Sequence, residues 1–97
     1  MRIITRQKLV QCWTKHRDAE DALKEWFKEA EHAQWKTPND IKVHFGTADF
    51  LNNNRVVFNI KGNHYRLIVQ IHYNTQVVYI RFAGTHKEYV KINAETI

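Results

Sequence analysis

The chain has few of the residues that cross-link or interrupt small proteins. Its 97 residues include one cysteine, Cys12, one proline and three glycines. A single cysteine excludes an intrachain disulfide, so we expect a reducing, cytoplasmic location. The sequence contains no signal peptide and no run of about 18 apolar residues. Neither secretion by that route nor a membrane span is therefore expected.

The remaining composition is that of one small globular domain. Hydrophobic residues make up 43% of the chain, and no repeat, low-complexity tract or linker divides it. We therefore expect a single domain over residues 1–97 with one core. The formal net charge of +5 favours an anionic partner, of which nucleic acid is the common case. An acidic protein or a membrane surface is the alternative.

Three segments between residues 55 and 82 alternate apolar and polar side chains with the period of a β-strand. Their apolar positions are Val56, Phe58 and Ile60, then Tyr65, Leu67, Val69 and Ile71, then Val78, Ile80 and Phe82. Gly62-Asn63 and Asn74-Thr75 lie between them and favour tight hairpin turns. The turns predict antiparallel pairs of Asn59 with Arg66, Val69 with Ile80, Ile68 with Arg81 and Leu67 with Phe82.

One face of this predicted sheet is a core, and the other is basic and rich in hydrogen-bonding groups. The polar face collects Arg55, Asn59, Lys61, His64, Arg66, Gln70, His72, Tyr79 and Arg81. Arg66 and Arg81 are predicted to be diagonal neighbours on central strands.

The segments before the sheet predict a short edge strand and helices. Met1 to Thr5 is apolar enough for the strand, Thr5 is expected to cap a helix over residues 6–16, and Asp18 a second helix. Trp13, Trp26 and Phe27 recur at helical spacing and should cover the sheet core. A third helix is expected up to Gly46, with Thr37 as its cap, Pro38 at its first position and Asp40 in its first turn. The fold class is α+β, with the short strand and two helices packed on one face of a twisted antiparallel sheet.

A short C-terminal helix is expected directly after the last strand. Thr85 and Glu88 have the spacing of a capping box. His86 and Tyr89 lie three residues apart, so they share one side of this helix. The chain is expected to leave the strand that carries Arg81 at Ala83-Gly84. Because the helix starts right after that strand, its His86 and Tyr89 side should overhang the polar face of the sheet.

The sequence from residue 52 to residue 92 resembles the HigB toxins of bacterial type II toxin-antitoxin systems, within the RelE-like superfamily. The likeness is carried by VVFNIKGNHYRL, YIRF and THKEY together, and extends upstream through WKTPNDIKVHF and the two N-terminal helices. The family commonly has an aspartate directly after the tyrosine of the last motif, where this chain has Val90.

The resemblance implies a RelE-like fold and a toxin that cuts mRNA, usually on translating ribosomes, without a cofactor. It also implies a cognate helix-turn-helix antitoxin of the HigA type and, through that protein, operator DNA. The motifs place the catalytic residues at Arg66, Arg81, His86 and Tyr89, and RNA contacts at Lys87, Lys61 and Asn59. His64 and Tyr79 join the RNA-binding candidates from the polar face.

Residue chemistry is compatible with such an activity. RNA cleavage without a metal needs a base, an acid and cations that neutralise the phosphorane. None of the six histidines lies at zinc-motif spacing to another, so no metal site is expected. Arg66 and Arg81 suit phosphate binding, and His86 is the first candidate for proton transfer. Tyr89 can stack on a nucleobase or act as the base.

Two other classes of protein fit the same residues. A non-catalytic RNA-binding module would share the basic face and its aromatics. An interaction protein could hold an acidic partner on that face. A neighbouring gene for a small helix-turn-helix protein would favour the toxin.

Overall fold

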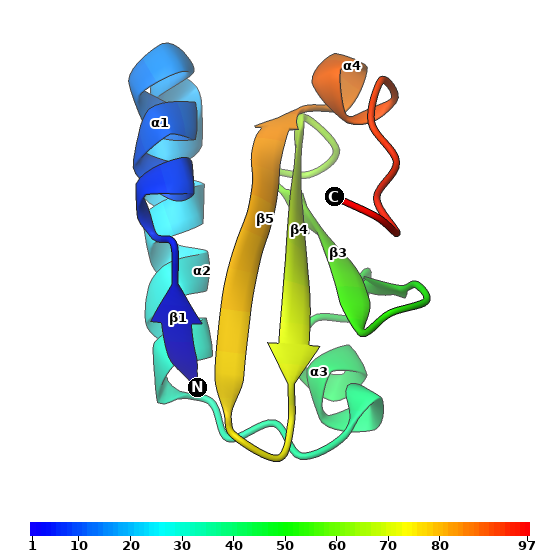
Figure 1. Ribbon diagram of the computed structural model, residues 1–97. Coiled ribbons are helices and arrows are strands. Elements are labelled where there is room, and N and C mark those ends of the chain that lie inside the picture. Colours follow the sequence, from blue (N-terminus) through cyan, green and yellow to red (C-terminus); the bar gives the residue numbers. More distant parts are fainter.

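The computed structural model describes residues 1–97 and has an α+β architecture built on one sheet (Figure 1). The sheet has five strands in the order β1-β5-β4-β3-β2. They are β1 (Arg2–Ile4), β2 (Asp49–Phe50), β3 (Arg55–Ile60), β4 (Tyr65–His72) and β5 (Val77–Thr85). Strand β1 forms the predicted edge but runs parallel to β5, so the sheet is mixed and not wholly antiparallel.

Two helices follow β1 and cover the core, as the apolar spacing predicts. They are α1 (Gln7–Lys15) and α2 (Glu20–His32), joined by the 3₁₀ turn η1 (Arg17–Ala19); α3 (Pro38–His44) and α4 (His86–Tyr89) come later. Figure 1 shows α1 and α2 along one side of the sheet and α4 at the far end of β5. Trp13 and Trp26 are buried in the main core, and Phe27 packs against it. None of the helices combines the length and the apolar character that a membrane span requires.

Two of the four predicted helix caps are present. Thr37 and Asp40 form a capping box at α3, and Thr85 and Glu88 form one at α4. Each box satisfies backbone N–H groups that the first helical turn leaves without partners. Both helices therefore begin where the local sequence places them.

The predicted caps at Thr5 and Asp18 are wrong. Thr5 makes no capping bond and has a φ of 71°, and α1 begins after Arg6. Asp18 lies inside η1, and its carboxylate binds the side chains of Tyr65 and Lys61 instead. Hydrogen bonds to an ionised carboxylate are strong, and these two donors occupy both oxygens of Asp18 in place of a helix N-terminus.

The first hairpin has the predicted register, and the second has it only near its turn. Asn59 pairs with Arg66 as expected. Val69 also pairs with Ile80, but a β-bulge follows, so Ile68 faces Phe82 and not Arg81. One extra residue in a strand reverses the alternation beyond it.

The bulge changes the face of the residues that follow it. Leu67 pairs with Ala83, which packs against the main core, whereas Phe82 does not join that core. The strand also continues to Thr85 and does not end at Ala83-Gly84 as predicted. The core side of the sheet is otherwise as predicted from Val56 to Ile80.

The second face of the sheet is only partly open. Val57 and Ile68 face each other across β3 and β4 and are buried, although neither belongs to the main core. Residues 93–97 fold back toward this face (Figure 1). The guanidinium of Arg55 is buried and donates to the Ile97 carbonyl at 2.7 Å. The expectation of a fully open polar face is therefore wrong at β3.

Candidate functional site

Three of the four predicted catalytic residues meet at the end of the sheet. The Arg66 guanidinium lies 5.9 Å from the ring centroid of Tyr89. The rings of Tyr89 and His86 are 6.2 Å apart and inclined by 26°. The backbone N–H of His86 donates to the carbonyl of His64 at 3.2 Å, which joins α4 to the β3–β4 loop. We call Arg66, His86 and Tyr89 the sheet-end group.

Arg81, the fourth predicted catalytic residue, lies at the β-bulge. Its guanidinium donates to Gln70 Oε1 at 2.6 Å and lies 5.4 Å from the ring centroid of Tyr79. Its Nε is buried without a hydrogen-bond partner. Arg81 thus holds a cation over the same face, but it is not the diagonal neighbour of Arg66 that the sequence predicts, because the bulge shifts the pairing and places Arg66 opposite Gly84.

The predicted RNA-binding residues separate into two places. His64 and Lys87 are exposed beside the sheet-end group, and Tyr79 lies under Arg81. Lys61 instead donates to Asp18 at 3.0 Å, on the helix side of the sheet, so its predicted place on the polar face is wrong. Lys61 has a φ of 53°, a left-handed backbone conformation that ends the extended strand. Its side chain therefore does not continue the alternation of β3. Asn59 pairs with Arg66 but also lines a hollow next to α2 with Lys61.

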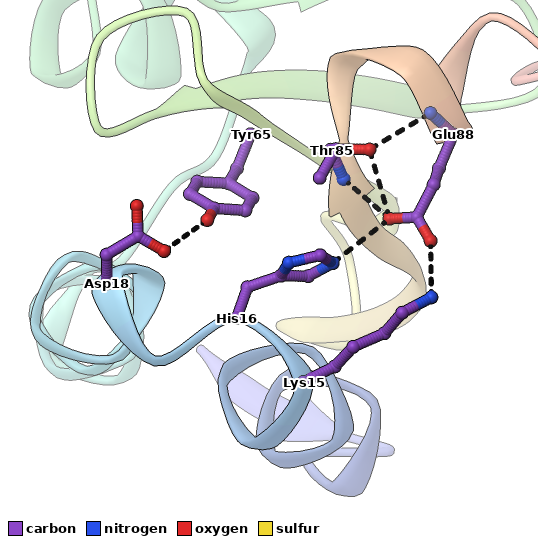
Figure 2. Close-up of polar contacts among 6 residues, drawn as sticks. All are labelled: Lys15, His16, Asp18, Tyr65, Thr85 and Glu88. Atoms are coloured by element: carbon purple, nitrogen blue, oxygen red, sulfur yellow. Dashed lines mark hydrogen bonds and ion pairs between the residues drawn. The ribbon is translucent and has the colours of Figure 1, made fainter.

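Glu88 holds α4, and with it the sheet-end group, against the first helix (Figure 2). Its Oε1 accepts from the Thr85 N–H at 2.9 Å, and its Oε2 accepts from Lys15 Nζ at 3.0 Å. His16 Nε2 lies 3.5 Å from Oε1. The Thr85 bond first, and then the Lys15 bond, lower the pKa of Glu88 from 4.5 to about 2.

A second polar contact joins the start of β4 to η1 (Figure 2). The buried Tyr65 hydroxyl donates to the Asp18 carboxylate. This bond, with burial second, raises the pKa of Tyr65 from 10.0 to about 12. The Tyr65 bond and then the Lys61 bond lower the pKa of Asp18. The ring of His16 lies 5.5 Å from that of Tyr65, between the two contacts.

The structure also contains a basic cleft that sequence reasoning missed. It lies between α1 and the bulged part of β5, and its volume is about 320 Å³. Its lining is Lys8, Gln11, Cys12, Lys15, His16, Arg81, Phe82, Ala83, Glu88 and Ile97. Lys8 and Lys15 are seven residues apart, so they share one face of α1. This spacing is the feature of the sequence from which one basic side of the cleft could be predicted. The sequence could not show that this face meets Arg81.

Neither a reactive thiol nor a metal-ligand cluster is found here. Burial raises the pKa of Cys12 to about 11, so its thiol stays protonated at neutral pH. Nowhere do three or more His, Cys, Asp or Glu side chains come together as metal ligands would. The chemical resources of the site are its guanidinium, imidazole, phenol and ammonium groups.

The mixed five-stranded sheet, with its helices and the short C-terminal helix, defines an α+β domain with a RelE-like fold. The model of the HigB toxin family, described as the RelE-like toxic component of a toxin-antitoxin system, matches residues 19–92. The chain belongs to the HigB toxin family.

Three similar proteins come from Escherichia coli and Shigella flexneri. The chain is 35% identical over 57 residues to the mRNA interferase toxin HigB of Escherichia coli K12. The same identity relates it to proteins named mRNA interferase HigB in Escherichia coli O157:H7 and Shigella flexneri. Each match covers 57% of this chain and 55% of the relative. The match thus spans about half the length of these relatives.

Proposed function

We propose that this protein is the toxin of a type II toxin-antitoxin system and acts as an endoribonuclease on mRNA. The observation that supports this most strongly is the sheet-end group. An arginine fixed on a strand, a histidine and a tyrosine converge there on an accessible surface. Membership of the HigB family and the interferase names of its relatives support the same reaction class.

The proposed reaction is an internal attack within RNA. A base removes the proton of a ribose 2′-hydroxyl, and the 2′-oxygen attacks the adjacent phosphorus. The bond from phosphorus to the 5′-oxygen breaks, and an acid gives that oxygen a proton. The products are a 2′,3′-cyclic phosphate and a 5′-hydroxyl, so the reaction needs no water and no redox partner.

Each residue of the site has a role in this proposal. Arg66 and Arg81 carry permanent charge and neutralise the phosphorane. His86 exchanges one of the two protons, since imidazole does so near neutral pH. Tyr89 stacks on a nucleobase beside the cut. Lys87 and His64, exposed nearby, bind the RNA backbone.

The proposal extends to the partners of the protein. It acts in the cytoplasm on mRNA held by the translating ribosome, whose RNA offers further phosphates to a chain of net charge +5. A cognate antitoxin of the HigA type, with a helix-turn-helix domain, binds and silences it, and carries the pair to operator DNA.

The test is cleavage by the purified protein, with free mRNA and with mRNA on translating ribosomes. Arg81→Ala and His86→Gln should each abolish new 5′ ends in primer extension, with a smaller effect on RNA binding. His32→Gln is the matched control, because His32 is exposed on α2, far from this face, and bonds only its own helix. Mass spectrometry should show that the upstream product ends in a 2′,3′-cyclic phosphate and that the downstream product begins with a 5′-hydroxyl.

A different outcome would favour the non-catalytic RNA-binding module. If the folded wild type binds RNA but leaves it intact in both settings, the endonuclease proposal is wrong. If cleavage persists in His86→Gln and Arg81→Ala at the level of the His32→Gln control, the assignment of the chemistry to these two residues is wrong. Cleavage of mRNA on translating ribosomes, without cleavage of free mRNA, would support the proposal that the protein acts on the ribosome.

A further inference from the structure

The basic cleft between α1 and the bulge lies outside the sheet-end group, yet Arg81 belongs to both surfaces. Its guanidinium lies over the sheet face beside Tyr79 and Gln70, and the residue also lines the cleft. Lys8 Nζ donates to the Arg81 carbonyl at 3.2 Å, which joins α1 to the bulged strand. An RNA strand on the sheet face can therefore continue into the cleft along one connected surface.

The charges that line the cleft favour an anion. Lys8, Lys15 and Arg81 contribute three cations, and Glu88 is the one carboxylate. Glu88 is already paired with Lys15 and the Thr85 N–H. An ammonium has three donors, so Lys15 retains two of them for a ligand, and Gln70 is the single partner of the Arg81 guanidinium. The free donors of these side chains match the oxygens of a phosphate.

The cleft also has an apolar part that suits a flat ring, beside the polar side chains of Gln11 and His16. Phe82 turns away from the main core because of the bulge, and it lines the cleft beside Ala83, Cys12 and Ile97. The volume of about 320 Å³ is at the lower end of the range of about 300–1,000 Å³ typical of small-ligand sites. A single nucleotide places one phosphate and one aromatic base in a space of that size.

We propose that this cleft is a nucleotide subsite, which holds the phosphate and base of a residue next to the one that is cut. Lys8 and Lys15 bind the phosphate, and Phe82 stacks on the base or sugar. Arg81 lies between this phosphate and the reacting one, because it belongs to both surfaces. The subsite extends the footprint on RNA beyond the reacting phosphate. The identification of the ligand as RNA rests on the proposed endonuclease function, whereas the binding of a nucleotide at the cleft does not.

A direct titration separates these two questions. Adenosine 5′-monophosphate added to ¹⁵N-labelled wild type should shift the amide signals of Cys12, Phe82 and Ala83. Lys8→Ala should weaken that binding at least fivefold. Lys28→Ala should leave it unchanged, because Lys28 is an equally exposed helical lysine outside the cleft. The absence of shifts at the cleft, or equal weakening by both variants, would overturn the subsite. Binding of inorganic phosphate as tight as that of the nucleotide would overturn the role of Phe82.

Cleavage kinetics then test the place of the subsite on RNA. Lys8→Ala should raise KM for a long RNA severalfold with little change in kcat, and should have no effect on a dinucleotide, which cannot fill the cleft. The log-log salt slope of binding should fall by about 0.7 for the lost phosphate contact. If the wild type cleaves no RNA but the nucleotide still binds at the cleft, the endonuclease proposal fails and the subsite stands. An equal KM effect on both substrate lengths would overturn the subsite.

Discussion

The carboxylate of Glu88 in the last helix lies 3.0 Å from the ammonium of Lys15 in the first. These residues are 73 positions apart in the sequence. Their ion pair and the capping box of Thr85 and Glu88 together form what we call the clamp. The clamp fixes the four-residue helix α4, which is too short to be stable by itself. Because α4 carries His86 and Tyr89, the clamp positions the sheet-end group.

Removal of the Glu88 side chain should loosen this clamp. We expect Glu88→Ala to lower the free energy of unfolding by about 1–2 kcal/mol through the lost cap, and Glu88→Gln by less than about 1 kcal/mol, because glutamine still accepts from Thr85. Denaturant unfolding measures both. Glu25→Ala, an exposed change on α2 outside any ion pair, is the control, and an equal effect there would contradict the clamp.

The Glu88 carboxylate should also make the stability of the fold depend on pH, with a loss of stability at acidic pH. The folded-state pKa of Glu88 is about 2 and its ordinary value is 4.5, so its contribution to stability is complete above pH 4.5. It should disappear as the pH falls toward 2. The stability difference between wild type and Glu88→Gln should therefore narrow over that window in acid unfolding curves. A difference that stays constant from pH 5 to pH 2 would argue against the depressed pKa.

Tyr65 should show the opposite pH dependence. Its pKa is raised to about 12, so the hydrogen bond to Asp18 stabilises the fold fully below pH 10 and is lost between pH 10 and pH 12. Tyr65→Phe should lower stability at neutral pH and converge with wild type in that alkaline window. Tyr79→Phe is the control, since the Tyr79 hydroxyl makes no hydrogen bond in the structure. In an absorbance titration, the tyrosine that ionises at the highest pH should be present in the wild type and in Tyr79→Phe and absent from Tyr65→Phe.

Gly84 sits where no side chain fits. A Cβ there would lie 2.8 Å from Glu88 Oε1 and 2.8 Å from Phe82 Cζ, so Gly84→Ala must displace the clamp or the Phe82 ring. We expect a loss of about 1–3 kcal/mol in thermal or denaturant unfolding, together with reduced RNA cleavage. Gly46→Ala meets no atom within 4 Å and is the matched control. Equal stability of the two variants would show that the neighbours of Gly84 adjust without cost.

Arg66 should depend on the shape of its side chain as well as its charge. Arg66→Ala should reduce cleavage by about 100-fold or more, because one fixed group that stabilises the transition state is lost. Arg66→Lys should recover only part of this loss, since an ammonium lacks the planar fork that binds phosphate and stacks on Tyr89. Single-turnover cleavage rates measure both. The exposed Arg2→Ala is the control, and full activity of Arg66→Lys would mean that charge alone suffices.

Local patterns predicted most of the sheet, the capping box at Thr85 and the cap at Thr37. The alternation from Val56 to Ile80 gave the core side, and the Gly62-Asn63 turn gave the register of Asn59 with Arg66. The spacing of His86 and Tyr89 gave their shared side of α4. These features involve residues close in sequence, whose geometry is restricted by the backbone itself.

The exceptions are positions where distant segments compete for the same group. Asp18 binds Tyr65 and Lys61 across more than 40 residues and so does not cap a helix. The bulge in β5 reverses the alternation of side chains between the two faces of the sheet. Phe82 therefore lies on the face away from the main core and lines the cleft. The apolar alternation of Val78, Ile80 and Phe82 continues through the bulge, so the pattern gives no sign of the extra residue.

The sequence by itself determined strands β1, β3 and β4, the two hairpin turns and the start of α4, but not strand β2 or the end of β5. Only the tertiary structure decided that Lys15 reaches Glu88, that Lys61 faces the helices and that α1 and β5 enclose a basic cleft. The first set follows from short-range backbone geometry. The second depends on long side chains, whose direction is chosen by whichever partner the folded chain brings within reach.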